Sequence, residues 1–88
     1  MYYAYIIQSS KSGSLYKGHS EDLATRLNQH NSGKVKSTKS GLPWVLVHYE
    51  TFQTREEAVS REKYFKTAAG RRFIKKLELK AVEVPTPD

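Results

Sequence analysis

The order in which strand and helix patterns follow one another constrains the fold of this chain more than any other feature. Two short runs of aromatic and β-branched residues, separated by a turn cluster at residues 9–13, predict a β-hairpin. Capped and amphipathic stretches then predict a helix, a third strand and two further helices. The predicted strands span residues 2–8, 14–19 and 44–52, and the predicted helices span residues 20–31, 54–66 and 71–79.

This β-β-α-β-α-α order has a topological consequence. A helical crossover returns the chain to the edge that it left, so the third strand should run parallel to the second. An antiparallel sheet then requires the first strand in the middle, in the order 2-1-3. We expect an α+β fold: a three-stranded antiparallel sheet flanked by three helices, which cover one face. Any cleft should lie where the first two strands meet the first two helices.

Capping residues mark where the helices should begin. Ser20 is the expected N-cap of the first helix, and Thr54 with Glu57 forms a Thr-x-x-Glu capping box at the second. Residues 68–70 should interrupt the helical stretch, so the third helix is expected to begin at Arg71. We predict one domain at residues 1–82 and a flexible tail at residues 83–88.

Composition excludes several kinds of function. A chain of 88 residues has room for one hydrophobic core. The absence of cysteine excludes disulfides, thiolate zinc sites and cysteine nucleophiles. Neither a signal peptide nor an apolar stretch of membrane-spanning length is visible, so we expect a cytoplasmic protein with no membrane partner.

The charge is basic and unevenly distributed. The formal net charge is +6, and residues 63–80 hold seven basic side chains against one acid, Glu78. Such clustering is typical of proteins that bind a polyanion, although solvated lysine faces on small domains give the same composition. The candidate nucleic-acid-binding residues are Lys34, Lys36 and Lys39 in the loop before the third strand, and Lys66, Arg71 and Arg72 nearer the C-terminus.

Glu62 lies where the second helix should carry an apolar residue. The apolar stripe of that helix runs from Ala58 through position 62 to Phe65, so a carboxylate faces the core. A buried charge is unfavourable unless it is paired or binds a metal. An ordinary salt bridge and a metal ligand are therefore both open interpretations of Glu62.

The first helix brings two more polar residues to its apolar side. Leu23 and Leu27 define that side, His30 falls within it and Arg26 lies on its border. His30 is either a hydrogen-bonded core histidine or a catalytic one. Arg26 and Glu62 form either an ordinary interhelical ion pair or part of a site.

The predicted hairpin adds two tyrosines. With a turn centred between residues 10 and 11, Tyr5 lies directly opposite Tyr16, although a one-residue slip would send them to opposite faces. Tyrosines at such positions are also ordinary packing residues. Gly18, inside a short strand, indicates a bulge or a close backbone approach.

In their order along the chain, these residues resemble the motifs of the GIY-YIG nuclease superfamily. The resemblance covers residues 2–76 and is greatest to small stand-alone bacterial members. Four positions depart from the family pattern: Tyr3-Ala4 stands in place of Gly-Ile, Lys17 replaces the central isoleucine, and His19 stands where several members have a lysine. The matching runs are Tyr3-Ala4-Tyr5, Tyr16-Lys17-Gly18, Arg26 through His30, and Glu62.

The resemblance implies a metal-dependent nuclease. Glu62 would bind the metal, Arg26 would be the catalytic arginine, and His30 would lie near the site. Tyr5 and Tyr16 would be the motif tyrosines. One carboxylate suits a single Mg²⁺ or Mn²⁺ that keeps water and phosphate oxygens as its other ligands. Arg26 would stabilise charge on the phosphoryl oxygens bidentately.

Such an enzyme needs a base for the attacking water, and the two tyrosines are the candidates. Ionising an ordinary phenol at pH 7 costs roughly 4 kcal/mol. A metal and Arg26 could offset that cost, or the proton could pass on to His30. We hypothesise that Tyr5 is the base and Tyr16 its positioning partner, and both routes for the proton stay open.

Three functions remain. The first is a DNA endonuclease of little sequence specificity, acting in DNA repair or recombination, with RNA as a second candidate substrate. The second is a nucleic-acid-binding module that keeps the scaffold without cutting. The third is an interaction domain in which an Arg26–Glu62 contact is structural. Only the first explains a Glu62 that is unpaired and half-buried. Oligomeric state and partner proteins are not readable from the sequence.

Overall fold

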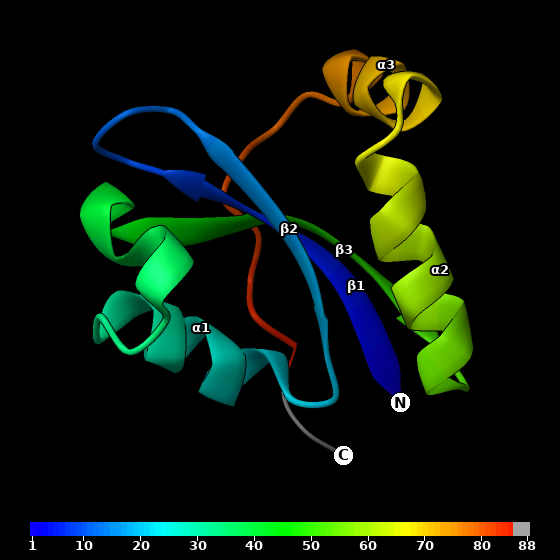
Figure 1. Cartoon of the computed structure of the whole chain (residues 1–88), viewed down its shortest axis with the longest axis horizontal. Coiled ribbons are helices and arrows are strands. Elements are labelled where there is room, and N and C mark those ends of the chain that lie inside the picture. Colours follow the sequence, from blue (N-terminus) through cyan, green and yellow to red (C-terminus); the bar gives the residue numbers. More distant parts are fainter. Residues whose placement is uncertain (86–88) are drawn as a thin grey trace.

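The computed structural model describes residues 1–85 and contains a three-stranded sheet, three α-helices and a short 3₁₀ helix (Figure 1). The predicted order of strands and α-helices is confirmed. The 3₁₀ helix lies in the loop before the third strand, where the sequence predicts no helix. The elements are β1 (Tyr2–Ser9), β2 (Leu15–Ser20), α1 (Leu23–Asn31), η1 (the 3₁₀ helix, Lys36–Gly41), β3 (Trp44–Phe52), α2 (Arg55–Phe65) and α3 (Ala68–Lys76).

The sheet has the predicted order β2-β1-β3, and both neighbouring pairs are antiparallel. The predicted register of the hairpin is wrong, because Tyr5 pairs with Gly18 rather than with Tyr16. The turn is centred later in the chain because Ser9 Oγ accepts hydrogen bonds from the N–H groups of residues 11 and 12, and Gly13 adopts a φ of +79°. A shift of two residues preserves the faces, so the two tyrosines are diagonal neighbours on one face.

Helices cover both faces of the sheet, so the prediction that they share one face is wrong (Figure 1). On one face, Ala4 of β1 packs with Phe65 of α2 and Ile74 of α3. On the other face, Tyr5 packs with Leu23 of α1. The reason lies in the central strand, whose residues 4–7 are all at most 1% exposed. A strand that is apolar at consecutive positions needs a cover on each side.

The start of α1 differs from the prediction. Asp22, not Ser20, is the N-cap, and its carboxylate accepts the backbone N–H of Thr25 at 3.1 Å. Ser20 instead accepts the backbone N–H of Asp22 at 3.1 Å, so both residues order the turn that enters the helix. The predicted capping box of Thr54 and Glu57 at the start of α2 is confirmed.

The predicted interruption at residues 68–70 is also wrong, because α3 begins at Ala68. Thr67 is the N-cap and accepts the backbone N–H of Gly70 at 3.0 Å. A β-carbon at Gly70 would overlap the carbonyl oxygen of Tyr64 at the end of α2. The glycine therefore permits close packing of two helices rather than ending one. At its other end, α3 stops at Lys76, before the predicted end near residue 79.

The chain beyond α3 returns along the outer side of β3. The backbone N–H of Val82 donates to the carbonyl oxygen of Leu46 at 2.9 Å, and Val84 packs against the core cluster that contains Tyr5. Part of the expected tail, residues 86–88, lies outside the described residues. Within residues 1–85, no helix is long and apolar enough to cross a membrane.

Candidate functional site

The five predicted site residues come from both sides of the sheet and approach one another around β2. Tyr5 is on β1, Tyr16 on β2, Arg26 and His30 on α1, and Glu62 on α2. The two helices lie on opposite sides of the sheet in Figure 1. Residues of α1 therefore reach the tyrosines from one face, whereas Glu62 reaches β2 from the other.

A buried chain of hydrogen bonds joins Tyr5 to the loop before β3. The hydroxyl of Tyr5 lies 2.9 Å from Nε2 of His30, and Nδ1 of His30 lies 2.8 Å from Oγ1 of Thr38. All three side chains are buried. Because Thr38 donates its own proton to the carbonyl oxygen of Val35 at 3.3 Å, the ring donates from Nδ1 and accepts the phenol proton at Nε2.

Thr38 is a residue that the sequence analysis missed. It lies in η1, and it is buried although its neighbours in that helix are exposed or half-buried. A single threonine in a basic, serine-rich loop carries no periodic or capping signal. The role of Thr38 in orienting the His30 ring is visible only once η1 is folded against α1.

Burial determines the proton affinities of this pair. Burial raises the pKa of Tyr5 to about 12, although the nearby charge of Arg26 acts in the opposite direction. Burial also lowers the pKa of His30 to about 4, and the charge of Arg26 lowers it further. At neutral pH, a neutral phenol therefore donates to a neutral imidazole.

Arg26 lies beside both tyrosines. Burial disfavours its charged form, but the phenol oxygens of Tyr5 and Tyr16 outweigh burial and raise its pKa. Its guanidinium also donates to Oε1 of Gln29 at 3.0 Å. The ring of Tyr16 meets the ring of His30 edge-on, with 5.0 Å between the centroids. The four residues Tyr5, Tyr16, Arg26 and His30 thus form one cluster.

Glu62 is not unpaired, so that expectation is wrong. Its Oε1 lies 2.7 Å from Nδ1 of His19, and its Oε2 lies 2.7 Å from Nζ of Lys66. Strand β2 directs His19 toward α2, and Lys66 lies one helical turn after Glu62, so both partners follow from the fold. Burial raises the pKa of Glu62, but these two hydrogen bonds outweigh it and hold the pKa below its usual range.

The charge of Glu62 acts on the tyrosine cluster, although burial is the main cause of the raised pKa of Tyr5. The negative charge of Glu62 is one of the lesser causes. No ion pair joins Arg26 to Glu62 among residues 1–85. The third function, an interaction domain, depended on a structural contact between Arg26 and Glu62, and this contact is absent.

The donors around Glu62 fit a divalent cation with few protein ligands. No group of three or more His, Cys, Asp or Glu residues that could hold a metal ion exists in the described part of the chain. Glu62 offers carboxylate oxygens, its side chain is 17% exposed, and the imidazole of His19 adjoins it. The carboxylate by itself suits Mg²⁺ or Mn²⁺, which keep several water or phosphate oxygens as ligands.

The predicted nucleic-acid-binding residues fall into two groups. Lys34, Lys36 and Lys39 are exposed in and just before η1. Lys66, Arg71 and Arg72 are exposed at and after the junction of α2 and α3. Their contact with nucleic acid stays a prediction.

One hollow adjoins the tyrosine cluster. It has a volume of about 330 Å³ and lies between the β1–β2 turn and η1. Tyr16 forms part of its wall, and hydroxyl groups and one cation form much of the rest. The lining residues are Lys11, Ser12, Ser14, Leu15, Tyr16, Ser37, Ser40, Gly41 and Trp44.

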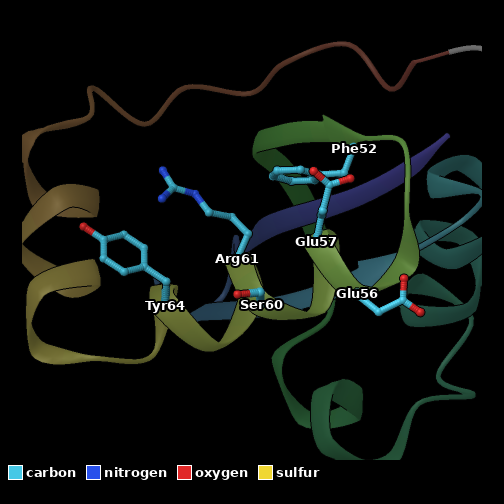
Figure 2. Close-up of a pocket in the computed structure, with 6 residues that line it drawn as sticks. All are labelled: Phe52, Glu56, Glu57, Ser60, Arg61 and Tyr64. Atoms are coloured by element: carbon cyan, nitrogen blue, oxygen red, sulfur yellow. The ribbon is translucent and has the colours of Figure 1, made fainter.

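A second hollow, of about 510 Å³, lies over α2 and the end of β3 (Figure 2). Figure 2 shows the side chain of Arg61 between Phe52 and Tyr64. Arg61 is already bound to Glu50, with Nε 2.8 Å from Oε1. The carboxylates of Glu56 and Glu57 line the same hollow and would repel a phosphate, so it does not suit a nucleic acid.

Known proteins resemble the chain over most of its length. The model of the GIY-YIG catalytic domain matches residues 1–77. UPF0213 protein SSP2268 of Staphylococcus saprophyticus is 40% identical over 75 residues, which cover 84% of this chain and 90% of that protein. UPF0213 protein HQ_3675A of Haloquadratum walsbyi is 42% identical over 67 residues, covering 75% and 74%. The solution NMR structure of UPF0213 protein BH0048 from Bacillus halodurans has 33% identity and a TM-score of 0.52, covering 89% and 86%.

Proposed function

The chain belongs to the GIY-YIG family of nuclease domains, and we propose that it hydrolyses phosphodiester bonds in DNA with a divalent cation. The observation that carries this proposal is the Tyr5–His30 hydrogen bond, which is buried beside the guanidinium of Arg26. The location in the cytoplasm, the low sequence specificity and a role in DNA repair or recombination belong to the same proposal, with RNA as a second substrate.

Tyr5 and His30 together would accept the proton of the attacking water. Given a pKa of about 12, ionising Tyr5 alone at pH 7 costs about 7 kcal/mol. Given a pKa of about 4, protonating His30 costs about 4 kcal/mol. The cheaper route moves the water proton to the Tyr5 oxygen while the phenol proton moves to Nε2 of His30. This difference favours the relay over a free phenolate.

Arg26 and Tyr16 would bind the phosphate that reacts. The guanidinium of Arg26 already lies beside both phenols, where it can donate to two phosphoryl oxygens. Tyr16 is half-buried and borders the 330 Å³ hollow, so it meets the substrate more directly than the buried Tyr5. We therefore assign Tyr16 to positioning and Tyr5 to proton transfer.

Glu62 would hold the cation, Mg²⁺ or Mn²⁺. When bound, such a cation neutralises charge on the phosphate and lowers the pKa of a bound water. For Glu62 to bind it, Lys66 must release Oε2, and the hydrogen bond from His19 must rearrange.

The pairing of Glu62 with His19 and Lys66 favours a second candidate function. Both carboxylate oxygens of Glu62 already have a partner, and if Glu62 binds no metal, the chain would bind nucleic acid without cutting it. This alternative uses the same basic residues, and it differs from the first only in that Glu62 does not bind a metal.

Incubation of the purified protein with plasmid, branched and single-stranded DNA, in Mg²⁺ or Mn²⁺ and in chelator, separates the two functions. The wild type should cut only with the cation, Glu62→Gln should not cut, and Glu56→Gln should cut normally, since Glu56 is exposed on the same helix. Cleavage that persists in Glu62→Gln would point to a contaminant. Salt-sensitive binding without cleavage by the wild type would favour the second function.

A further inference from the structure

Three cationic side chains gather where β2 passes the junction of α2 and α3. Lys17 pairs with Ile6, whose side chain packs in the core cluster formed with α2 and α3, so Lys17 faces those helices. Arg71 donates from Nη1 to the backbone carbonyl oxygen of Lys66 at 3.3 Å, which brings its guanidinium to the same junction. Lys66 in turn contacts Glu62, so this cluster adjoins the candidate cation site.

Among residues 1–85, Glu62 is the one carboxylate that pairs with this cluster of three cations. Burial lowers the pKa of Lys17, and the charges of Arg71 and Lys66 lower it further. Within residues 1–85, Lys66 is the only one of the three that forms an ion pair with a carboxylate. Like charges that are held together repel one another, and a bound anion removes that repulsion.

We propose that Lys17, Lys66 and Arg71 bind a backbone phosphate of the nucleic acid next to the phosphate that is cut. This inference rests on the proposed function and extends it to the path of the substrate strand. The strand would run from the tyrosine cluster, past Glu62, to the α2–α3 junction. A phosphate at the junction would also attract Lys66 away from Glu62 and free Oε2 for the cation.

Binding of a labelled 12-nucleotide single-stranded DNA, measured by fluorescence anisotropy in chelator over a range of NaCl concentrations, tests the subsite. Loss of one phosphate contact should reduce the slope of log K against log salt by about 0.7 for single strands. We expect this change for Lys17→Gln, with affinity reduced roughly 3- to 10-fold near 0.1 M salt. Lys17→Arg should keep the wild-type slope.

Lys76→Gln is the matched control, because Lys76 is exposed on α3 and lies roughly 140° around the helix from Arg71. A wild-type slope in Lys17→Gln, or an equal loss in Lys76→Gln, would overturn the subsite. Lys17→Gln should unfold at no lower temperature than the wild type, since it removes a repulsion. The binding measurement is made in chelator, where no DNA is cut, so it does not depend on cleavage. If the salt dependence changed in Lys17→Gln but the wild type cut no DNA in Mg²⁺ or Mn²⁺, the proposed nuclease function would be wrong and the proposed phosphate subsite would stand.

Discussion

A β-carbon at residue 18 would lie 2.6 Å from the hydroxyl oxygen of Tyr5. The two residues are direct partners across β1 and β2, and the phenol ring of Tyr5 extends over the bare backbone of Gly18. Only in this position does the hydroxyl meet Nε2 of His30 on the helix that covers this face. Glycine is therefore needed in β2 for space and not for an unusual backbone conformation.

Gly18→Ala should displace Tyr5 from His30. Inserting a methyl group into a packed contact costs about 1–3 kcal/mol of stability. In a domain of this size, each kcal/mol lowers the unfolding midpoint by about 4–8 °C. Thermal unfolding followed by circular dichroism measures the loss, and DNA cleavage should fall with it. An unchanged midpoint would show that the tyrosine ring moves aside without cost.

His30 should make the stability of the fold depend on pH. Its pKa is about 4 in the folded protein and near 6.5 in a free histidine, so the unfolded chain binds the extra proton first. The contribution is therefore complete above pH 6.5 and is lost as the pH falls toward 4, by about 3 kcal/mol in total. Urea unfolding between pH 4 and pH 7.5 measures this loss.

The His30→Gln variant is the control for that measurement. Glutamine can still bond to Tyr5 and Thr38 but does not titrate, so the slope of stability against pH should be smaller between pH 4 and pH 6.5. The other two histidines are unchanged and serve as an internal reference. Identical slopes in the wild type and the variant would mean that His30 is not the responsible group.

Tyr5→Phe should remove the proton relay. Cleavage should fall at least about 100-fold, the usual effect of losing general acid–base catalysis. The variant leaves Nε2 of His30 unbonded, so stability should also fall by about 1–3 kcal/mol. Tyr49→Phe is the matched control, since Tyr49 pairs with Tyr5 from the opposite strand, β3. If Tyr16→Phe abolished cleavage and Tyr5→Phe did not, the roles assigned to the two tyrosines would be reversed.

Lys66→Met should strengthen cation binding. The ammonium of Lys66 occupies Oε2 of Glu62 and repels a divalent cation, so its removal should tighten Mn²⁺ binding roughly 3- to 10-fold. Electron paramagnetic resonance of free Mn²⁺ measures this affinity without any DNA. Lys63→Met, an exposed neighbour on α2, should leave the affinity nearly unchanged. Weaker Mn²⁺ binding in Lys66→Met would contradict a metal site at Glu62.

Local patterns determined the order of the elements, the strand order and the capping box at Thr54. The elements and the cap depend on residues close in sequence, which hydrophobic periodicity and capping residues reveal. The strand order follows from how the chain connects these elements. The close approach to the backbone at Gly18 was one of two interpretations of its position, because a glycine inside a strand indicates a bulge or a close approach. The pattern does not identify the approaching side chain. Motif order also selects the five candidate site residues, whose roles stay a prediction, but it does not predict their contacts.

Tertiary structure alone decided which atoms meet in the site. The turn at Ser9 and Gly13 moved the hairpin register by two residues, and no strand pattern distinguishes registers that keep the same faces. Glu62 is paired because β2 directs His19 toward α2, and His30 is neutral because the fold buries it against Tyr5 and Thr38. Such contacts join residues far apart in the chain, so their charges and hydrogen bonds exist only once the sheet and helices are assembled.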